Sequence, residues 1–505
     1  WRWLYRIISL SLFLAGLVFA ATVLALRYWI LPDIGRYRED IAASISRAAG
    51  QRVTIGSIAA EWDRLRPRLT MGGVQVYDQQ GRPALFLGHV ESPLSWQTLA
   101  VGELRLHSLE FLRPALHIRR DAQDRLFVAG IQVNRPDTRS DFADWVLRQP
   151  NILIRDAEVH WQDDKRQAPP LTLKNLNLRL DNHGRRHRFG LKAVPPEALA
   201  GPVDLRGDLR GKDLGNFAAW KGTVYARLDR ADLGAWRPWI PFPFELARGT
   251  GGVRFWLSFE AGKIGELTAD LGLNGVRARL RAELPELELR SLSGRLEWRR
   301  LPNGQEFRAQ RLRFAANHDI ALPSTDFFLR YQGGEGGKPA QGEIRADGLV
   351  IDPLVKLADY LPLEPGQRTR LAELGPQGSF RDFTLKWTGE PERPQHYSAK
   401  GQFVGLGMRP SGKLPGFRGV SGHVDATEKG GVLALNSRKV EAGFPGIFSD
   451  PLTLDALTAR VNWKVREGGL DLNLASASFA NADLAGEVYG GYHTVAGTPA
   501  TTVGG

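Results

Sequence analysis

Apolar and polar residues alternate along most of the chain, from residue 52 onward. The segment TADLGLNGVRARLRAELPELELR (268–290) shows the pattern clearly, because apolar side chains occupy every second place in two successive runs. This period of two predicts β-strands that have one apolar face and one polar face. The pair Asn274-Gly275 lies between the two runs and predicts a two-residue hairpin turn, which needs positive φ at both central residues.

Short alternating runs of this kind, bounded by Gly, Pro, Asn and Asp, recur as far as residue 474 and predict about 25 strands. Strands do not alternate with long helices, which argues against a doubly wound parallel sheet. We therefore predict a mainly β protein with a long, twisted, mostly antiparallel sheet. Two short helical patterns interrupt the strands, at 140–149 and at 353–361.

The first 30 residues have the composition of a membrane anchor. Residues 7–26 carry no charge, and twenty residues of helix at about 1.5 Å each span roughly 30 Å, the thickness of the hydrocarbon core of a bilayer. The alternative is a cleaved signal peptide, but the apolar run is long for one. Arg2 and Arg6 favour a cytoplasmic N-terminus. We therefore expect a single-pass protein of the inner membrane, with the bulk of the chain in the periplasm.

The pattern divides the chain into six segments. We expect one amphipathic helix after the anchor to cap an end of the sheet, although such a helix can also lie on the membrane surface. The Gly-rich tail is of low complexity, and we expect it to be disordered. The segments are the anchor (1–30), the capping helix (31–50), a first β-groove segment (51–345), a helical and loop insertion (346–378), a continuing β-groove segment (379–490) and the tail (491–505).

Composition narrows the possible chemistry. The 505 residues include no cysteine, which excludes disulfides, thiol nucleophiles and thiolate metal sites. The formal net charge of +12 favours anionic partners. However, the arginines are spread over many strands, and an outward-facing anchor makes nucleic acid an unsuitable partner. We interpret the arginines as a solvated surface, with attraction to anionic lipid head groups as the alternative.

No set of residues in the sequence forms a convincing catalytic or metal-binding motif. The loop GGEGGK (333–338) lacks the first Gly and the final Ser or Thr of a phosphate-binding loop. His183 and His187 lie four residues apart, but the surrounding arginines would repel a cation. The pair Asp163-Asp164 follows a strand and is better explained as a turn than as an acid–base pair. We therefore expect no enzyme activity, no metal and no cofactor.

The apolar strand faces are the remaining candidate for function. A sheet with one wet face must cover the other with a second sheet, with helices or with a ligand. The predicted helices are too few to cover about 25 strands. A closed core between two sheets and an open, ligand-carrying face both remain possible from periodicity alone.

Three segments resemble a known family. The run VESPLSWQTLAVGELRLHSLEFLRPALHIRRDAQDRLFVAG (90–130) resembles the AsmA-like proteins, with Trp96, Gly102 and Pro114 at matching places. Two later runs are similar to the YhdP branch of that family: ADWVLRQPNILIRDAEVHW (143–161) and LVIDPLVKLADYLPLEPGQRTRLAELGPQGSFRDFTLKW (349–387). The resemblance covers most of residues 1–470.

This resemblance implies a bridge-like lipid-transfer protein that is not an enzyme. Such proteins form a bent sheet with an apolar concave groove that carries phospholipid from the inner membrane towards the outer membrane. Full members are longer, so we expect an N-terminal fragment whose missing C-terminal part contacts the outer membrane. The alternative is a structural envelope protein with a closed β core and no lipid.

The residues that we expect to face the groove depend on the phase of each strand, because a slip of one residue swaps the two faces. They are Leu104, Leu106, Leu109, Phe111, Phe255, Leu257, Phe259, Leu271, Leu273, Val276, Leu280, Phe383 and Leu385.

Overall fold

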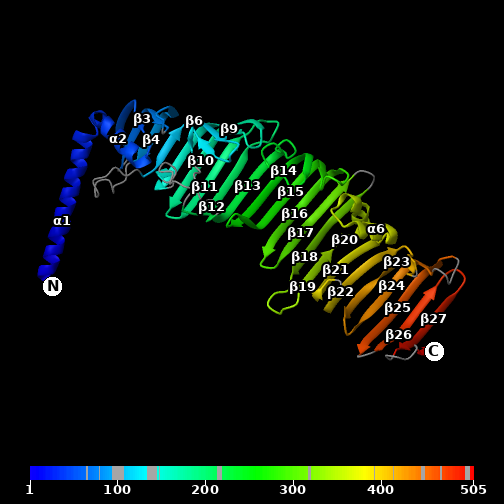
Figure 1. The fold of residues 1–505 in the computed structure, drawn as a ribbon. Coiled ribbons are helices and arrows are strands. Elements are labelled where there is room, and N and C mark those ends of the chain that lie inside the picture. The colour runs from blue at the N-terminus through cyan, green and yellow to red at the C-terminus, as the bar shows by residue number, and fades with distance from the viewer. Residues whose placement is uncertain are drawn as a thin grey trace. The chain divides into compact units, whose positions relative to one another are not determined.

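The chain folds mainly as one long, open β-sheet, here in a computed structural model (Figure 1). It divides into two compact units. The first unit comprises Trp1–Asp229, Pro238–Ile240 and Ser258–Lys263, and the second comprises Arg230–Arg237, Pro241–Leu257 and Ile264–Gly505. The structure describes residues 1–63, 66–78, 80–93, 107–132, 145–146, 148–212, 219–316, 320–391, 393–412, 414–444, 450–466, 469–494 and 501–504.

The first unit begins with helices. α1 (Arg2–Ala25) continues through a π-helical turn, η1 (Leu26–Ile30), and is followed by a 3₁₀ turn, η2 (Ile34–Tyr37), and by α2 (Arg38–Ala49). The span from Arg2 to Ile30 has a mean hydropathy of 2.5 and is long and apolar enough to cross a membrane. Within 31–50, where the sequence predicts one helix, the 3₁₀ turn η2 precedes α2.

The strands of the first unit are mostly antiparallel, and β5 and β6 both pair with β9 in parallel. The last three residues of β13 belong to the second unit. The strands are β1 (Val53–Thr54), β2 (Ser57–Asp63), β3 (Arg66–Tyr77), β4 (Pro83–Pro93), β5 (Leu109–Leu112), β6 (Ala115–Arg120), β7 (Leu126–Val128), β8 (Ile131–Gln132), β9 (Asn151–Asp163), β10 (Ala168–His183), β11 (Arg186–Val194), β12 (Val203–Arg210) and β13 (Lys221–Asp232).

The second unit continues with antiparallel strands that pair mainly with their neighbours in sequence. The C-terminal end of β14 and the first residue of β15 belong to the first unit. The strands are β14 (Glu245–Glu260), β15 (Lys263–Arg279), β16 (Leu287–Leu301), β17 (Gly304–Ala316), β18 (Ala321–Gln332), β19 (Gln341–Asp347), β20 (Leu349–Val350), β21 (Gln377–Glu390), β22 (Arg393–Met408), β23 (Gly416–Thr427), β24 (Gly430–Gly443), β25 (Leu452–Arg466), β26 (Gly469–Ala480), β27 (Ala485–His493) and β28 (Thr501–Gly504).

The hairpin turn predicted at Asn274-Gly275 is wrong, because β15 runs straight through this pair. Its register with β16 is unbroken, with Leu273 opposite Leu292 and Val276 opposite Leu289. Of the pair, Gly275 alone has positive φ, at 58°, whereas a type I′ turn needs it at both residues. The left-handed residue shifts the alternation by one place, so the apolar residues on its two sides face the same way.

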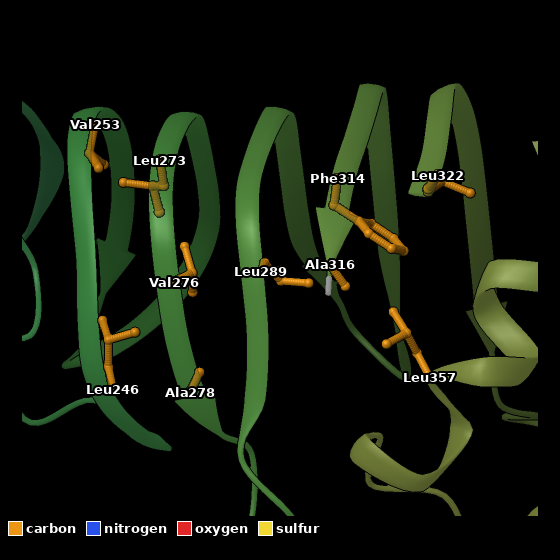
Figure 2. Close-up of a cluster of buried hydrophobic side chains, with 10 residues drawn as sticks. All are labelled: Leu246, Val253, Leu273, Val276, Ala278, Leu289, Phe314, Ala316, Leu322 and Leu357. Atoms are coloured by element: carbon orange, nitrogen blue, oxygen red, sulfur yellow. The ribbon is translucent and has the colours of Figure 1, made fainter. Parts of the chain in front are cut away.

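Many other strands contain a left-handed residue along their length, as β-bulges do. In some cases a side chain of the next strand accepts a hydrogen bond from the displaced backbone N–H. The N–H of Arg311 donates to Asp326 Oδ1 at 2.6 Å, and that of Gly405 to Ser421 Oγ at 2.9 Å. Bulges bend a strand, and Figure 2 shows the strands of the second unit bending over. Residues of this kind include Asp156, Asn175, Arg230, Gly275, Arg311, Asp382, Gly405 and Lys439.

The helical insertion is more divided than the sequence predicts. In place of one helix over 353–361, α5 (Asp352–Lys356) and a 3₁₀ turn, η4 (Ala358–Tyr360), precede a second helix, α6 (Pro365–Leu374). Most of the helix predicted at 140–149 lies outside the described residues. Part of the tail expected to be disordered lies in strands β27 and β28.

Candidate functional site

An apolar cavity of about 220 Å³ lies in the first unit. Its lining comes from α2 and from eight strands between β1 and β10, together with Pro114, Trp145 and Val146. Every lining side chain is aliphatic or aromatic, or a methionine or proline. Because an apolar cavity of roughly 150 Å³ already stays dry and binds benzene, this cavity is suited to an apolar group and not to water.

The alternation of β3 and β4 produces much of this lining. Val74 and Val76 on β3 lie on the same face as Leu85 and Leu87 on β4, since residues two apart share one face of a strand. Val76 is directly opposite Leu85, and Val74 is opposite Leu87. Leu178 and Leu180 on β10, which are also two residues apart, line the cavity as well.

Helix α2 covers part of the cavity. Ile45 and Ala49 line it, and Ile41 and Ile45 pack against the buried cluster that includes Val53 and Met71. The helix ends at Gly50, whose φ of 64° is the left-handed conformation common after a helix. Ser46 Oγ accepts a hydrogen bond from the Val53 N–H at 2.8 Å, which holds α2 against β1.

The second unit has its own apolar cluster, which crosses five neighbouring strands from β14 to β18 (Figure 2). Leu357, from the insertion between β20 and β21, joins the cluster. Around it lie apolar side chains that are only half-buried, among them Phe255, Leu271 and Leu292. The buried members are Leu246, Val253, Leu273, Val276, Ala278, Leu289, Phe314, Ala316, Leu322 and Leu357.

Charged residues that alternate with these apolar residues form ion pairs between strands. Arg295 Nε lies 2.6 Å from Asp270 Oδ1, and Arg277 Nε lies 3.3 Å from Glu288 Oε1. The hydrogen bond from Arg295 lowers the pKa of Asp270 below its usual value. Because Arg277 belongs to a cross-strand pair and is exposed, it fits the predicted solvated surface.

The structure places the predicted groove residues in several environments. In the first unit Leu109 and Phe111 line the cavity, and Phe259 is half-buried. In the second unit Leu273 and Val276 belong to the buried cluster, and Phe255 and Leu271 pack against it. Leu257, Leu280, Phe383 and Leu385 are half-buried elsewhere in the second unit. Leu104 and Leu106 lie outside the described residues.

The predicted groove residues include none from β1, β3, β4 or β10, although these strands line the cavity. The signal was present, because Val74, Val76, Leu85 and Leu87 alternate in the same way as the chosen residues. What the sequence does not give is the parallel pairing of β5 with β9, which brings Phe111 opposite Ile154. Residues 43 apart in sequence carry no local sign of that contact.

The candidate catalytic groups have structural partners. Asp163 is buried and bonded to Arg120, while Asp164 Oδ2 accepts a hydrogen bond from Arg119 Nε at 2.6 Å. His187 is buried against the ring of Trp220. Among the described residues there is no group of three or more His, Cys, Asp or Glu side chains that could hold a metal ion.

Comparison with known proteins gives one match, to the model of a protein family. The family model described as YhdP protein matches residues 2–503. No curated protein and no solved structure matches the chain. The family match supports, in general terms, a non-enzymatic lipid-transfer protein of the cell envelope. The sequence resemblance is thereby confirmed, and the chain belongs to the YhdP family.

Proposed function

We propose that this protein is anchored in the inner membrane through residues 7–26 and carries phospholipid between the inner and outer membranes, with the acyl chains held against the apolar face of its sheet. The observation that carries the proposal is the cavity of the first unit, whose lining is wholly apolar. The half-buried apolar side chains of the second unit offer the same chemistry on a more open surface.

The free energy of moving an acyl chain out of a membrane explains why such a surface is sufficient. Each CH₂ group costs about 0.8 kcal/mol to expose to water, so a 16-carbon chain faces a barrier of about 12 kcal/mol to leave a membrane unaided. An apolar surface removes most of this barrier and needs neither a nucleophile nor a metal ion. Weak contacts with Leu, Val and Phe side chains also allow the lipid to move on.

The alternative is a closed core that gives the protein a scaffolding role. Such a core would bury its large apolar side chains completely, as protein interiors do. Phe255, Leu257 and Leu385 are instead half-buried. This partial exposure favours an apolar face that lipid can cover reversibly and argues against a permanently closed core.

Photo-crosslinking separates the two functions. A photoreactive amino acid in place of Phe255 faces the apolar cluster, and one in place of the adjacent, exposed Arg254 faces the other side of the strand. We expect phospholipid adducts at position 255 and none at position 254 when the protein is illuminated in membranes. Absence of adducts at both positions would contradict lipid transport and favour the closed core.

A further inference from the structure

The insertion between β19 and β21 is not needed to hold these two strands together. They pair directly, from Gln341 opposite Thr388 to Ala346 opposite Phe383. The chain between them nevertheless makes a long excursion through β20, α5, η4 and α6 before it returns. We call residues 349–374 the strap. Because the sheet is already continuous beneath it, the strap can change position without breaking the pairing of β19 with β21.

The strap lies on the apolar face of the second unit. Leu357 is 5% exposed and belongs to the same cluster as Phe314, Ala316 and Leu322. Figure 2 shows Leu357 reaching this cluster from the helical segment. Val350, Leu354 and Tyr360 pack against the cluster as well. The strap therefore covers a part of β17 and β18 with side chains of the kind that an acyl chain would replace.

The polar ties between the strap and the strands, within the described residues, lie near its two ends. At the first end β20 pairs with β21, the Ile351 N–H donates to the Gly378 carbonyl at 2.8 Å, and the Gly378 N–H donates to Asp352 Oδ2 at 2.9 Å. At the second end the Arg409 N–H donates to the Leu374 carbonyl at 2.6 Å. Apolar packing thus holds the middle of the strap, and apolar packing is not specific for one partner.

Glycines with left-handed backbone flank the strap on both sides. Gly348 has a φ of 66°, and Gly375 has a φ of 50° and ends α6. Hinges are commonly a few residues at the ends of elements that absorb changes in φ and ψ. None of the ten residues of α6 is buried, so little packing opposes a movement of this helix.

We propose that the strap is a gate on the lipid path. When the strap is seated, Leu354, Leu357 and Tyr360 occupy the apolar face and an acyl chain cannot pass over β17 and β18. When it lifts, the acyl chain takes the place of these side chains on the same surface. This inference rests on the proposed function, since it assigns a control element to the same apolar face.

A reversible bridge between the strap and the sheet tests the gate. The chain has no cysteine, so thiols introduced as Leu322→Cys and Leu357→Cys are the only ones present. A short bis-methanethiosulfonate reagent joins them, and a reductant separates them again. The full chain is placed in vesicles of phosphatidylethanolamine and phosphatidylglycerol. A photoreactive residue replaces either Phe255 on β14, before the strap along the chain, or Phe403 on β22, a buried apolar residue after the strap.

We expect bridging to abolish lipid adducts at position 403, to leave those at position 255 unchanged, and to be reversed by the reductant. Each single-cysteine variant, treated with the same reagent, should retain adducts at both positions. Adducts at position 403 that persist after complete bridging would overturn the gate. Absence of adducts at both positions before bridging would instead overturn the proposed function, so the two failures can be told apart.

A second variant tests the gate without a crosslink. Leu357→Asp places a charge in the apolar cluster and should unseat the strap, which raises the yield of adducts at position 403. Ala372→Asp adds the same charge on the exposed surface of α6 and should leave that yield unchanged. An unchanged or lower yield with Leu357→Asp, in a protein whose circular dichroism is that of the parent chain, would contradict the gate.

Discussion

At the scale of single residues, His187 shows how a polar group is accommodated inside the first unit. Its Nδ1 lies 2.7 Å from Asn182 Oδ1, and Asn182 Nδ2 donates to the Gln149 carbonyl at 2.8 Å. Because the amide thereby presents its oxygen to the ring, Nδ1 must carry the proton. Burial lowers the pKa of His187, since a charged imidazole would lose its hydration.

The lowered pKa gives a pH dependence with a definite sign. The unfolded chain, with an ordinary histidine pKa of about 6.5, binds the proton more readily than the folded chain. This contribution to the stability of the fold is therefore complete above pH 6.5 and is lost as the pH falls below it. We expect the midpoint temperature of thermal unfolding to decrease when the pH is lowered from 7.5 to 5.5. The decrease should be smaller in His187→Gln. Equal decreases in the two proteins would contradict this account.

A charge introduced at one residue of the apolar face tests whether that face binds lipid. Leu271 is half-buried beside the cluster of the second unit, so Leu271→Asp should leave the fold intact while it repels acyl chains. We expect lipid adducts at position 255 to be lost with an unchanged circular dichroism spectrum. Arg254→Asp, at an exposed position, is the matched control and should keep the adducts. Unfolding of Leu271→Asp would favour a closed core.

At the scale of the strand, the left-handed residues decide which side chains face the same way. Leu273 and Val276 are three residues apart, and yet both are in one buried cluster. In a regular strand they would point to opposite faces. Gly275 makes the difference through its φ of 58°, which residues with a Cβ adopt only at a cost.

Substitution of two glycines in the same strand measures that cost. A Cβ at Gly275 would meet no atom within 4 Å, so Gly275→Ala tests the backbone alone. We expect it to lower the free energy of unfolding of the second unit by about 1 kcal/mol. Gly272→Ala, where a Cβ would have its nearest neighbour at 3.9 Å and φ is not left-handed, should be neutral or slightly stabilising. Urea unfolding followed by tryptophan fluorescence gives both values, and equal effects would contradict the argument.

The same residues show how far the sequence predicts the structure. Alternation correctly predicts a mainly β, mostly antiparallel sheet, because each strand has a wet face and an apolar face. At Asn274-Gly275 it reveals a change of phase, but a turn and a single left-handed residue within a strand both produce one, and only the long pairing of β15 with β16 distinguishes them. Leu357 belongs to the same buried cluster as Phe314, 43 residues earlier, and this association has no local signal in the sequence.

At the scale of the whole molecule, α1 and η1 form the apolar span through which we propose that the protein is anchored in the membrane. In the most apolar stretch of the span Arg2–Ile30, no residue is buried within the protein. Leu31, directly after the span, is by contrast buried, with 3% of its surface exposed. Removal of residues 1–30 therefore takes away the apolar span and leaves the packed residues after it in place. We expect the shortened chain to remain soluble after an alkaline carbonate wash and the full chain to stay with the membranes. Equal retention of both would contradict an anchor in residues 1–30.

The pairing of strands determines where this protein begins to unfold. From β10 to β18, and again from β22 to β27, the strands whose partners are described pair with their neighbours along the chain. Stability is then close to a sum of terms between adjacent strands, as in a repeat protein, and cooperativity is limited. Heat or mutation at one strand should loosen that strand and its two neighbours first, while distant strands keep their protection from hydrogen exchange.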